Sequence, residues 1–143
     1  GEPLNDTIVN ELATYEQIVM LCGHYEGFDE RIREIIKPRE ISIGDFVLTG
    51  GELPALCLID AVSRKIEGTL GKIESADEDS FSNGLLEYPH YTKPREYRGI
   101  NVPEVLLNGN HKDINEFRYQ ESLKRTKLKR PDLYQRYVEK IQK

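Results

Sequence analysis

Apolar residues recur every three or four positions in several stretches of the chain, which is the spacing of a buried helix face. Ile8, Val9 and Leu12 follow the capping residue Asn5 and predict a first helix near residues 6–13. The same spacing, with glycine, proline or a capping side chain at the ends, predicts four more helices. They are expected at residues 28–36, 52–66, 111–127 and 131–141.

Two short apolar runs have the composition of strands. Residues 17–21 end just before Gly23, and residues 41–49 are strand-forming residues that include Gly44. Together with the helices between and after them, these runs indicate an α/β fold with parallel strands. Ligands of such sheets bind beyond the carboxyl ends of the strands. The loops at residues 22–27 and 44–51 are therefore the expected ligand site.

Glycine is concentrated in the second loop, at Gly44, Gly50 and Gly51. Because glycine has no Cβ, the main chain can turn sharply there or lie directly against a ligand. We interpret the loop as one whose main chain binds a ligand. A strand, a tight turn and a helix start without a ligand would use the same glycines, so the glycines by themselves leave both interpretations open.

The apolar pattern changes after residue 70. Residues 71–84 are acidic and contain serine, and we interpret them as a linker whose carboxylates are otherwise simply solvated. Prolines and tyrosines in residues 85–102 indicate an extended, irregular segment. The helix at residues 111–127 is expected to bury Ile114, Phe117 and Leu123, and in the last helix Leu133, Tyr137 and Ile141 recur on one face. The predicted organisation is one domain at residues 1–70, a linker at 71–84 and a small helical domain at 85–143.

Composition excludes a membrane-spanning protein. The 143 residues are 38% apolar and 31% charged, and no apolar run approaches the roughly 20 residues that cross a bilayer. Cys22 and Cys57 have no metal-type spacing, which favours reduced thiols and a cytoplasmic setting. The chain begins at Gly1 without a methionine, and we expect it to be a fragment.

Charge is distributed unevenly along the chain, whose net charge is −5. Residues 1–110 hold 10 basic and 20 acidic side chains, whereas residues 111–143 hold 10 basic and 5 acidic ones. A basic segment on an acidic body is a candidate nucleic-acid contact, because Lys and Arg bind phosphates. A solvated helix face is the alternative.

Several kinds of chemistry have no support in the sequence. His24, His90 and His111 are scattered, and no HExxH, Cys/His cluster, GxSxG, Walker loop or GxGxxG is present. Composition and spacing thus indicate an α/β ligand-binding domain joined to a small basic helical one.

Seven motifs in order resemble the bacterial tRNA (guanine-N1)-methyltransferase family, and they extend over nearly the whole chain. They are CGHYEGFDER (22–31), SIGDFVLTGGELP (42–54), DAVSR (60–64), EDSF (78–81), PHYT (89–92), VPEVLL (102–107) and GNH (109–111). The resemblance implies a SPOUT-class α/β fold, with a parallel sheet and a trefoil knot that is incomplete here, plus a small, mainly helical C-terminal domain. It also implies that the chain lacks the amino-terminal part of the family.

The resemblance further implies that S-adenosylmethionine binds through the main chain of the two loops. The matching residues are Cys22, Gly23, Tyr25, Glu26, Gly27, Ser42, Ile43, Gly44, Asp45, Phe46, Val47, Leu48, Gly50, Gly51 and Pro54.

Methylation of guanine N1 at the position 3′ of the anticodon requires removal of the N1 proton. Asp79 matches the catalytic aspartate of the family and is the expected base. Arg64 matches the arginine that would offset the charge on the guanine O6. Glu26 and Asp79 match carboxylates implicated in a Mg²⁺ requirement.

The resemblance implies tRNA as the partner and a homodimer that shares its active sites between subunits. The expected RNA contacts are Ser80, His90, Lys124, Arg125 and Arg130. Two alternatives remain open. One is a non-catalytic module that binds tRNA or the cofactor, and the other is a small-ligand α/β domain with a dimerising tail.

Overall fold

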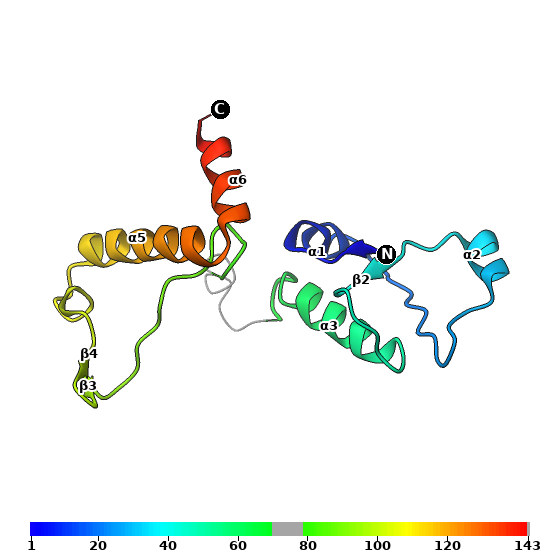
Figure 1. Cartoon of the computed structure of the whole chain (residues 1–143), viewed down its shortest axis with the longest axis horizontal. Helices are drawn as coiled ribbons and strands as arrows, with labels where there is room; N and C mark the ends of the chain where they lie inside the picture. The colour runs from blue at the N-terminus through cyan, green and yellow to red at the C-terminus, as the bar shows by residue number, and fades with distance from the viewer. Residues whose placement is uncertain (70–78, 143) are drawn as a thin grey trace. The chain divides into compact units, whose positions relative to one another are not determined.

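The computed structural model describes residues 1–69 and 79–142 (Figure 1). The chain divides into two compact units, at residues 1–76 and 77–143, and each is described by itself. None of the described helices is both long and apolar enough to cross a membrane.

The first unit combines a small parallel sheet with three helices. Its elements are β1 (Glu2–Pro3), α1 (Asp6–Leu12), α2 (Glu30–Ile36), β2 (Ile41–Ser42) and α3 (Glu52–Ser63). Strands β1 and β2 pair in parallel, with Glu2 opposite Ile41 and Pro3 opposite Ser42. The expectation of a mixed α/β fold with parallel strands is therefore confirmed at this coarse level.

The core of the first unit lies between α1 and α3. Ile8, Val9 and Leu12 of α1 pack with Val62 of α3, and all four are buried. The side chain of Asn5 accepts a hydrogen bond from the Ile8 N–H at 3.1 Å and caps α1. The predicted first helix and its buried face are confirmed.

Helix α2 forms where its sequence pattern predicts but buries none of its side chains. Asp29 caps it, Lys37 ends it in the left-handed conformation at φ 50°, and Pro38 follows. The helix lies apart from α1 and α3 at the far side of an open loop (Figure 1). Its apolar side chains accordingly stay on the surface, with Ile35 80% exposed.

The predicted strand at residues 17–21 is wrong for this structure. The segment is extended but pairs with no strand among the described residues, and Val19, Met20 and Leu21 are exposed. The predicted strand at residues 41–49 is limited to Ile41–Ser42. A strand exists only where a neighbour satisfies its backbone hydrogen bonds, and the apolar composition of a segment does not supply that neighbour.

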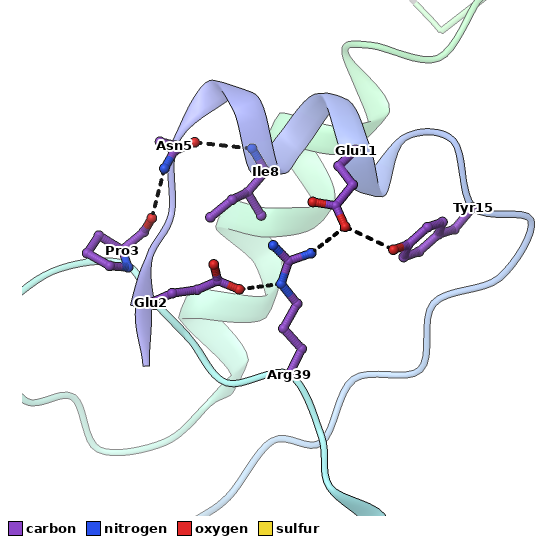
Figure 2. Close-up of polar contacts among 7 residues, drawn as sticks. All are labelled: Glu2, Pro3, Asn5, Ile8, Glu11, Tyr15 and Arg39. Carbon is purple, nitrogen blue, oxygen red and sulfur yellow. Dashed lines mark hydrogen bonds and ion pairs between the residues drawn. The ribbon is translucent and has the colours of Figure 1, made fainter.

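A charged cluster ties the start of the chain to the segment before β2. The guanidinium of Arg39 contacts the carboxylates of Glu2 and Glu11, the latter at 2.8 Å, and Figure 2 shows it between them. The Tyr15 hydroxyl donates to Glu11 at 3.0 Å. Hydrogen bonding to Arg39 lowers the pKa of both glutamates below their ordinary value of 4.5. The cluster therefore reinforces the pairing of β1 with β2.

Replacing Arg39 with Gln is expected to raise the pKa of Glu2 and Glu11 toward 4.5, because the donor that stabilises both carboxylates is lost. In the unaltered chain this stabilisation is present above about pH 4.5 and is lost as pH falls through the lowered values. Carboxyl ¹³C shifts followed across pH would measure both groups. Arg31→Gln is the control, since Arg31 pairs with Asp29 instead. Unchanged values in Arg39→Gln would contradict the assignment.

The second unit is a short hairpin, a turn of 3₁₀ helix and two helices. Its elements are β3 (Glu96–Tyr97), β4 (Ile100–Asn101), η1 (Glu104–Leu106), α5 (His111–Lys129) and α6 (Pro131–Ile141). Both long helices are where the sequence predicts them, and α5 runs two residues further than expected. Asn110 caps α5 and contacts Asp113, while Pro131 opens α6.

The hairpin was not predicted, although residues 85–102 were expected to be extended. Its turn residues, Arg98 and Gly99, both have positive φ, at 52° and 80°. A two-residue turn of that kind matches the twist of two antiparallel strands. A polar residue followed by glycine was the available signal.

The second unit is held together by a buried threonine on α5. Leu86 donates its N–H to the Thr126 hydroxyl at 2.8 Å, and that hydroxyl donates to the Ser122 carbonyl at 2.7 Å. Thr126 is fully buried, as is Leu85 beside this contact, whereas the expected buried positions Ile114, Phe117 and Leu123 are only half-buried. A hydroxyl therefore anchors the segment at residues 79–88 to α5.

Thr126→Val is expected to lower the free energy of unfolding of the second unit by about 1–3 kcal/mol, because the half-buried Leu86 N–H loses its acceptor. Urea unfolding followed through the amide signals of α5 would measure the change. Thr126→Ser keeps the hydroxyl and removes one methyl group, so its loss is expected to be smaller, about 0.8 kcal/mol. Equal stability of the valine variant and the unaltered chain would refute this role.

Candidate functional site

The two glycine loops expected to hold a ligand lie against each other. His24 and Gly50 form an isolated antiparallel bridge, and the Gly51 N–H donates to the Gly23 carbonyl at 3.0 Å. A Cβ on Gly51 would stand 2.8 Å from the Cys22 Cα and 3.1 Å from the Gly23 nitrogen. Only glycine allows this approach, so the second loop is built to lie on the first.

The main chain of the second loop makes few internal hydrogen bonds. Ser42 closes the turn, since its hydroxyl accepts from the Gly44 N–H at 3.2 Å and donates to the Gly44 carbonyl at 3.0 Å. Among the described residues, the N–H groups of Ile43, Phe46 and Leu48 have no hydrogen-bond partner. These three amides are donors that a ligand could use.

The first loop turns between His24 and Gly27, whose N–H donates to the His24 carbonyl at 3.0 Å. Tyr25 is fully exposed with φ 52°, and Gly27 has φ 96°, so the left-handed backbone there suits glycine. The His24 Nε2 contacts the carboxylate of Glu52 at the start of α3. This contact connects the first loop to α3, the helix that follows the second loop.

Apolar side chains stand exposed around the two loops. Phe46 is 60% exposed and Val47 97%, with Leu48, Leu53 and Leu56 also on the surface. Pro54 lies in the first turn of α3, where the missing N–H costs no hydrogen bond. The main-chain donors of the second loop therefore lie beside apolar surface, which suits a ligand with both a polar edge and an apolar body.

The two expected catalytic residues belong to different units. Arg64 follows the last turn of α3, and its N–H donates to the Asp60 carbonyl at 3.2 Å. Asp79 lies in the second unit, half-buried, in the turn that precedes Phe81.

Asp79 lines a cavity of about 220 Å³ in the second unit. One wall comes from the segment at residues 79–88 and the other from α5. The polar lining residues are Asp79, Asn83, Glu87, Tyr88, Asn115, Arg118, Tyr119 and Ser122. A linker was predicted at residues 71–84, and the cavity was not predicted. The spacing of Asn115, Arg118 and Ser122 on one helix face was the signal that could have indicated it.

Arg118 and Tyr88 of the cavity lining stack together with His90. The Arg118 guanidinium lies 4.7 Å from the centre of the Tyr88 ring, and the His90 ring lies 4.8 Å from it. His90 also contacts Glu87 at 2.6 Å, and the Glu87 N–H donates to the Ser80 hydroxyl at 2.9 Å. Ser80 and His90, both expected RNA contacts, are thus brought together with the cavity that contains Asp79.

The basic residues of the expected RNA face differ in their availability. Arg130 is bound in a two-point contact with Asp132, at 2.9 and 2.7 Å. That contact raises the pKa of Arg130 and lowers the pKa of Asp132 to about 2. Lys124 is exposed and reaches Glu121 only at 3.5 Å. Lys124 is therefore freer than Arg130 to meet a phosphate.

No group of three or more metal-ligating side chains occurs in the part of the chain that the structure describes. Glu26 is exposed in the first unit and Asp79 is half-buried in the second. Their role toward Mg²⁺ stays a prediction.

These features define an α/β protein of two compact units, the first with two glycine loops in contact and the second with a basic helix, α5. A family model described as tRNA (Guanine-1)-methyltransferase TrmD matches residues 1–136. The chain belongs to this family.

Similar proteins carry the same description. The chain is 59% identical over 133 residues to a tRNA (guanine-N(1)-)-methyltransferase of Desulforamulus reducens, covering 93% of this chain and 52% of that protein. It is 57% identical over 136 residues to one of Dehalococcoides mccartyi (95% and 55%) and 56% identical over 140 residues to one of Clostridioides difficile (98% and 61%). The chain spans little more than half the length of these relatives.

Proposed function

We propose that the chain is part of an enzyme that methylates guanine N1 in tRNA, at the position 3′ of the anticodon, with S-adenosylmethionine as donor. The observation that carries the proposal is the contact of the two glycine loops in a member of this methyltransferase family. A main-chain site of this kind suits a donor that combines an adenine edge, a ribose and a methionine part.

The residues of the two loops fit S-adenosylmethionine by their chemistry. The amides of Ile43, Phe46 and Leu48 offer donors to the adenine edge, and the exposed Phe46 and Val47 offer apolar contact. Gly51 lets the second loop lie directly on the first, and Gly23 leaves room for the Phe28 ring, which a Cβ there would meet at 2.9 Å. S-adenosylmethionine supplies an electrophilic methyl group when bound.

Two residues of the chain act on the guanine in this proposal. Asp79 accepts the N1 proton as the nitrogen attacks, and Arg64 offsets the negative charge that develops on O6. Both steps depend on position, because a reacting pair held in line reacts far faster than one that must first meet. Asp79 lines a cavity, which supports its role in holding a substrate group. In the homodimer we propose, Arg64 of one subunit and Asp79 of the other act on the same guanine.

The finer features of the family complete the proposal. They are a SPOUT-type trefoil knot, a cofactor domain at residues 1–70, a linker at 71–84, an RNA-binding domain at 85–143, a cytoplasmic homodimer with shared active sites, and Mg²⁺ at Glu26 and Asp79. Basic side chains on α5, led by the exposed Lys124, would hold anticodon-stem phosphates.

Tritiated S-adenosylmethionine is the direct test. With the full gene product that carries this chain, we expect label in tRNA that has guanine beside the anticodon and none in tRNA with adenine there. Equal labelling of both tRNAs, or none of either, would contradict the proposal. Salt-dependent tRNA binding without any transfer of label would favour the non-catalytic alternative.

A further inference from the structure

His24 and Glu52 belong neither to the proposed chemistry nor to the proposed main-chain contacts of the cofactor. His24 lies in the first glycine loop, and Glu52 is the first residue of α3, directly after the second loop. The His24 Nε2 contacts the Glu52 carboxylate, and the backbones of His24 and Gly50 form the bridge between the loops. A side-chain contact therefore lies beside the main-chain contact of the two loops.

Gly50 leaves the space that this side-chain contact occupies. A Cβ on Gly50 would overlap the Glu52 Oε2, so the carboxylate lies where any other residue would carry its side chain. The same Cβ would stand 3.5 Å from the Gly23 carbonyl oxygen, which is an ordinary van der Waals distance. At Gly51 a Cβ would instead meet the backbone of Cys22. The two glycines thus have separate roles, since Gly51 admits the backbone of the first loop and Gly50 admits the carboxylate.

The contact between His24 and Glu52 is weak by itself and acts through what it holds together. Both side chains are exposed, and exposed pairs contribute little to folding. The loops also meet through the Gly51 N–H, which donates to the Gly23 carbonyl at 3.0 Å. Where so few bonds join two loops, one more contact changes how much of the time they stay together. A site held in place before its ligand arrives binds more tightly, because less ordering is left for binding to bring about.

We propose that His24 and Glu52 are positioning residues of the two-loop site. Their contact across Gly50 holds the first loop on the second and thereby sets the affinity for the methyl donor. The proposal rests on the proposed function for the identity of that donor, S-adenosylmethionine. Neither side chain is assigned a step of methyl transfer, in which Asp79 takes the proton.

The test is a double-mutant cycle in the full gene product, with the affinity for S-adenosylmethionine measured by titration calorimetry. His24→Ala and Glu52→Ala are each expected to weaken binding about two- to fivefold, the range of an exposed pair. The double variant is expected to bind no more weakly than the weaker single variant, because each change removes the same contact. Unchanged affinity in both single variants, or effects that multiply in the double variant, would overturn the proposal. The cycle also separates the contact from the separate benefit of a carboxylate at the start of α3.

The rates of methyl transfer give a second measurement that loss of folded protein would not imitate. KM for S-adenosylmethionine is expected to rise as the affinity falls, while kcat at saturation stays the same, because the bound loops are unchanged. A lower kcat with unchanged KM would overturn the positioning role. His24→Gln places an amide donor at nearly the reach of the lost Nε2 and is expected to restore most of the affinity. If His24→Gln binds as weakly as His24→Ala, the donor has no role.

Gly50→Ala tests the contact without removing either partner. Its Cβ displaces the carboxylate, so we expect the same loss of affinity as in Glu52→Ala. Adding Gly50→Ala to Glu52→Ala is expected to change nothing further, and an additional loss would overturn the role given to Gly50. Arg33→Gln is the matched control. It removes an ion pair with Glu30 on α2, at 2.6 Å, and is expected to leave the affinity unchanged.

Hydrogen exchange at the Gly51 amide measures the hold between the loops directly. We expect His24→Ala and Glu52→Ala to speed this exchange about two- to fivefold while the amides of α1 exchange as before, since the loops open locally. Unchanged exchange at Gly51 in both variants would overturn the proposal.

The two proposals fail in different ways. If the full gene product binds S-adenosylmethionine and responds to these variants as expected but transfers no methyl group to tRNA, the proposed function falls and the positioning role stands. If methyl transfer occurs but the variants bind the cofactor unchanged, the positioning role falls and the proposed function stands.

Discussion

Asp79→Ala is expected to lower the rate of methyl transfer to tRNA by about 10²–10⁴-fold, the usual contribution of a positioned general base. Guanine N1 carries a proton at neutral pH, so attack on the methyl group requires an acceptor for that proton. The Asp79 carboxylate, at the edge of a cavity in the second unit, is the acceptor we propose. Single-turnover assays with saturating tRNA and S-adenosylmethionine in the full gene product would measure the loss at the chemical step.

The same variant is expected to bind S-adenosylmethionine almost normally, because the proposed cofactor loops belong to the first unit. Asp79→Asn tests the base more narrowly, since the amide preserves the shape and cannot take the proton. Glu139→Gln removes an exposed carboxylate on α6 and is the matched control with unchanged turnover. Turnover by Asp79→Ala equal to that of the unaltered enzyme would remove Asp79 from the mechanism.

Gly51→Val is expected to weaken S-adenosylmethionine binding by at least about tenfold, a loss of about 1.4 kcal/mol. A Cβ at this position would meet the Cys22 Cα at 2.8 Å and the Gly23 nitrogen at 3.1 Å, so the backbone of the first loop has to move. Because the proposed site is the main chain of these two loops, that movement displaces the donors and acceptors themselves. Titration calorimetry with the cofactor would measure the change.

Stability has to be measured beside affinity, since forcing a side chain into a packed contact costs about 1–3 kcal/mol by itself. Gly109→Asn is the control. Its φ of 73° is one that asparagine tolerates, and a Cβ there meets nothing within 4 Å. We expect this variant, in the second unit, to bind the cofactor normally. Cofactor affinity retained in a folded Gly51→Val would show that the contact between the loops does not shape the site.

Helices were predictable because their signals are local. The cap at Asn5, the cap at Asn110 and the proline at Pro131 each act within one turn, and the observed helices begin beside them. The close approach of the second glycine loop was indicated for a similar reason. Gly50 and Gly51 identify a backbone that must approach something closely, and the structure shows that Gly51 approaches Gly23.

Strands and the cavity were not predictable in the same way. Residues 17–21 have a strand-like composition but no partner among the described residues, while Glu2 and Pro3 pair with β2 without any sequence pattern that indicates it. Pairing depends on which segment folding brings alongside. The cavity likewise requires that residues 79–88 lie on a helix some 30 to 40 positions further along the chain, through the contact of Leu86 with Thr126.

The sequence by itself determined the helices, the glycine loops and, through its motifs, the family, because each of these depends on residues close together in the chain. Only the tertiary structure decided that the Gly23 loop supports the Gly51 loop and that Arg118 stacks on Tyr88 beside Asp79. Those contacts join residues far apart in the chain. They form only when packing repays the entropy of closing the loops between them.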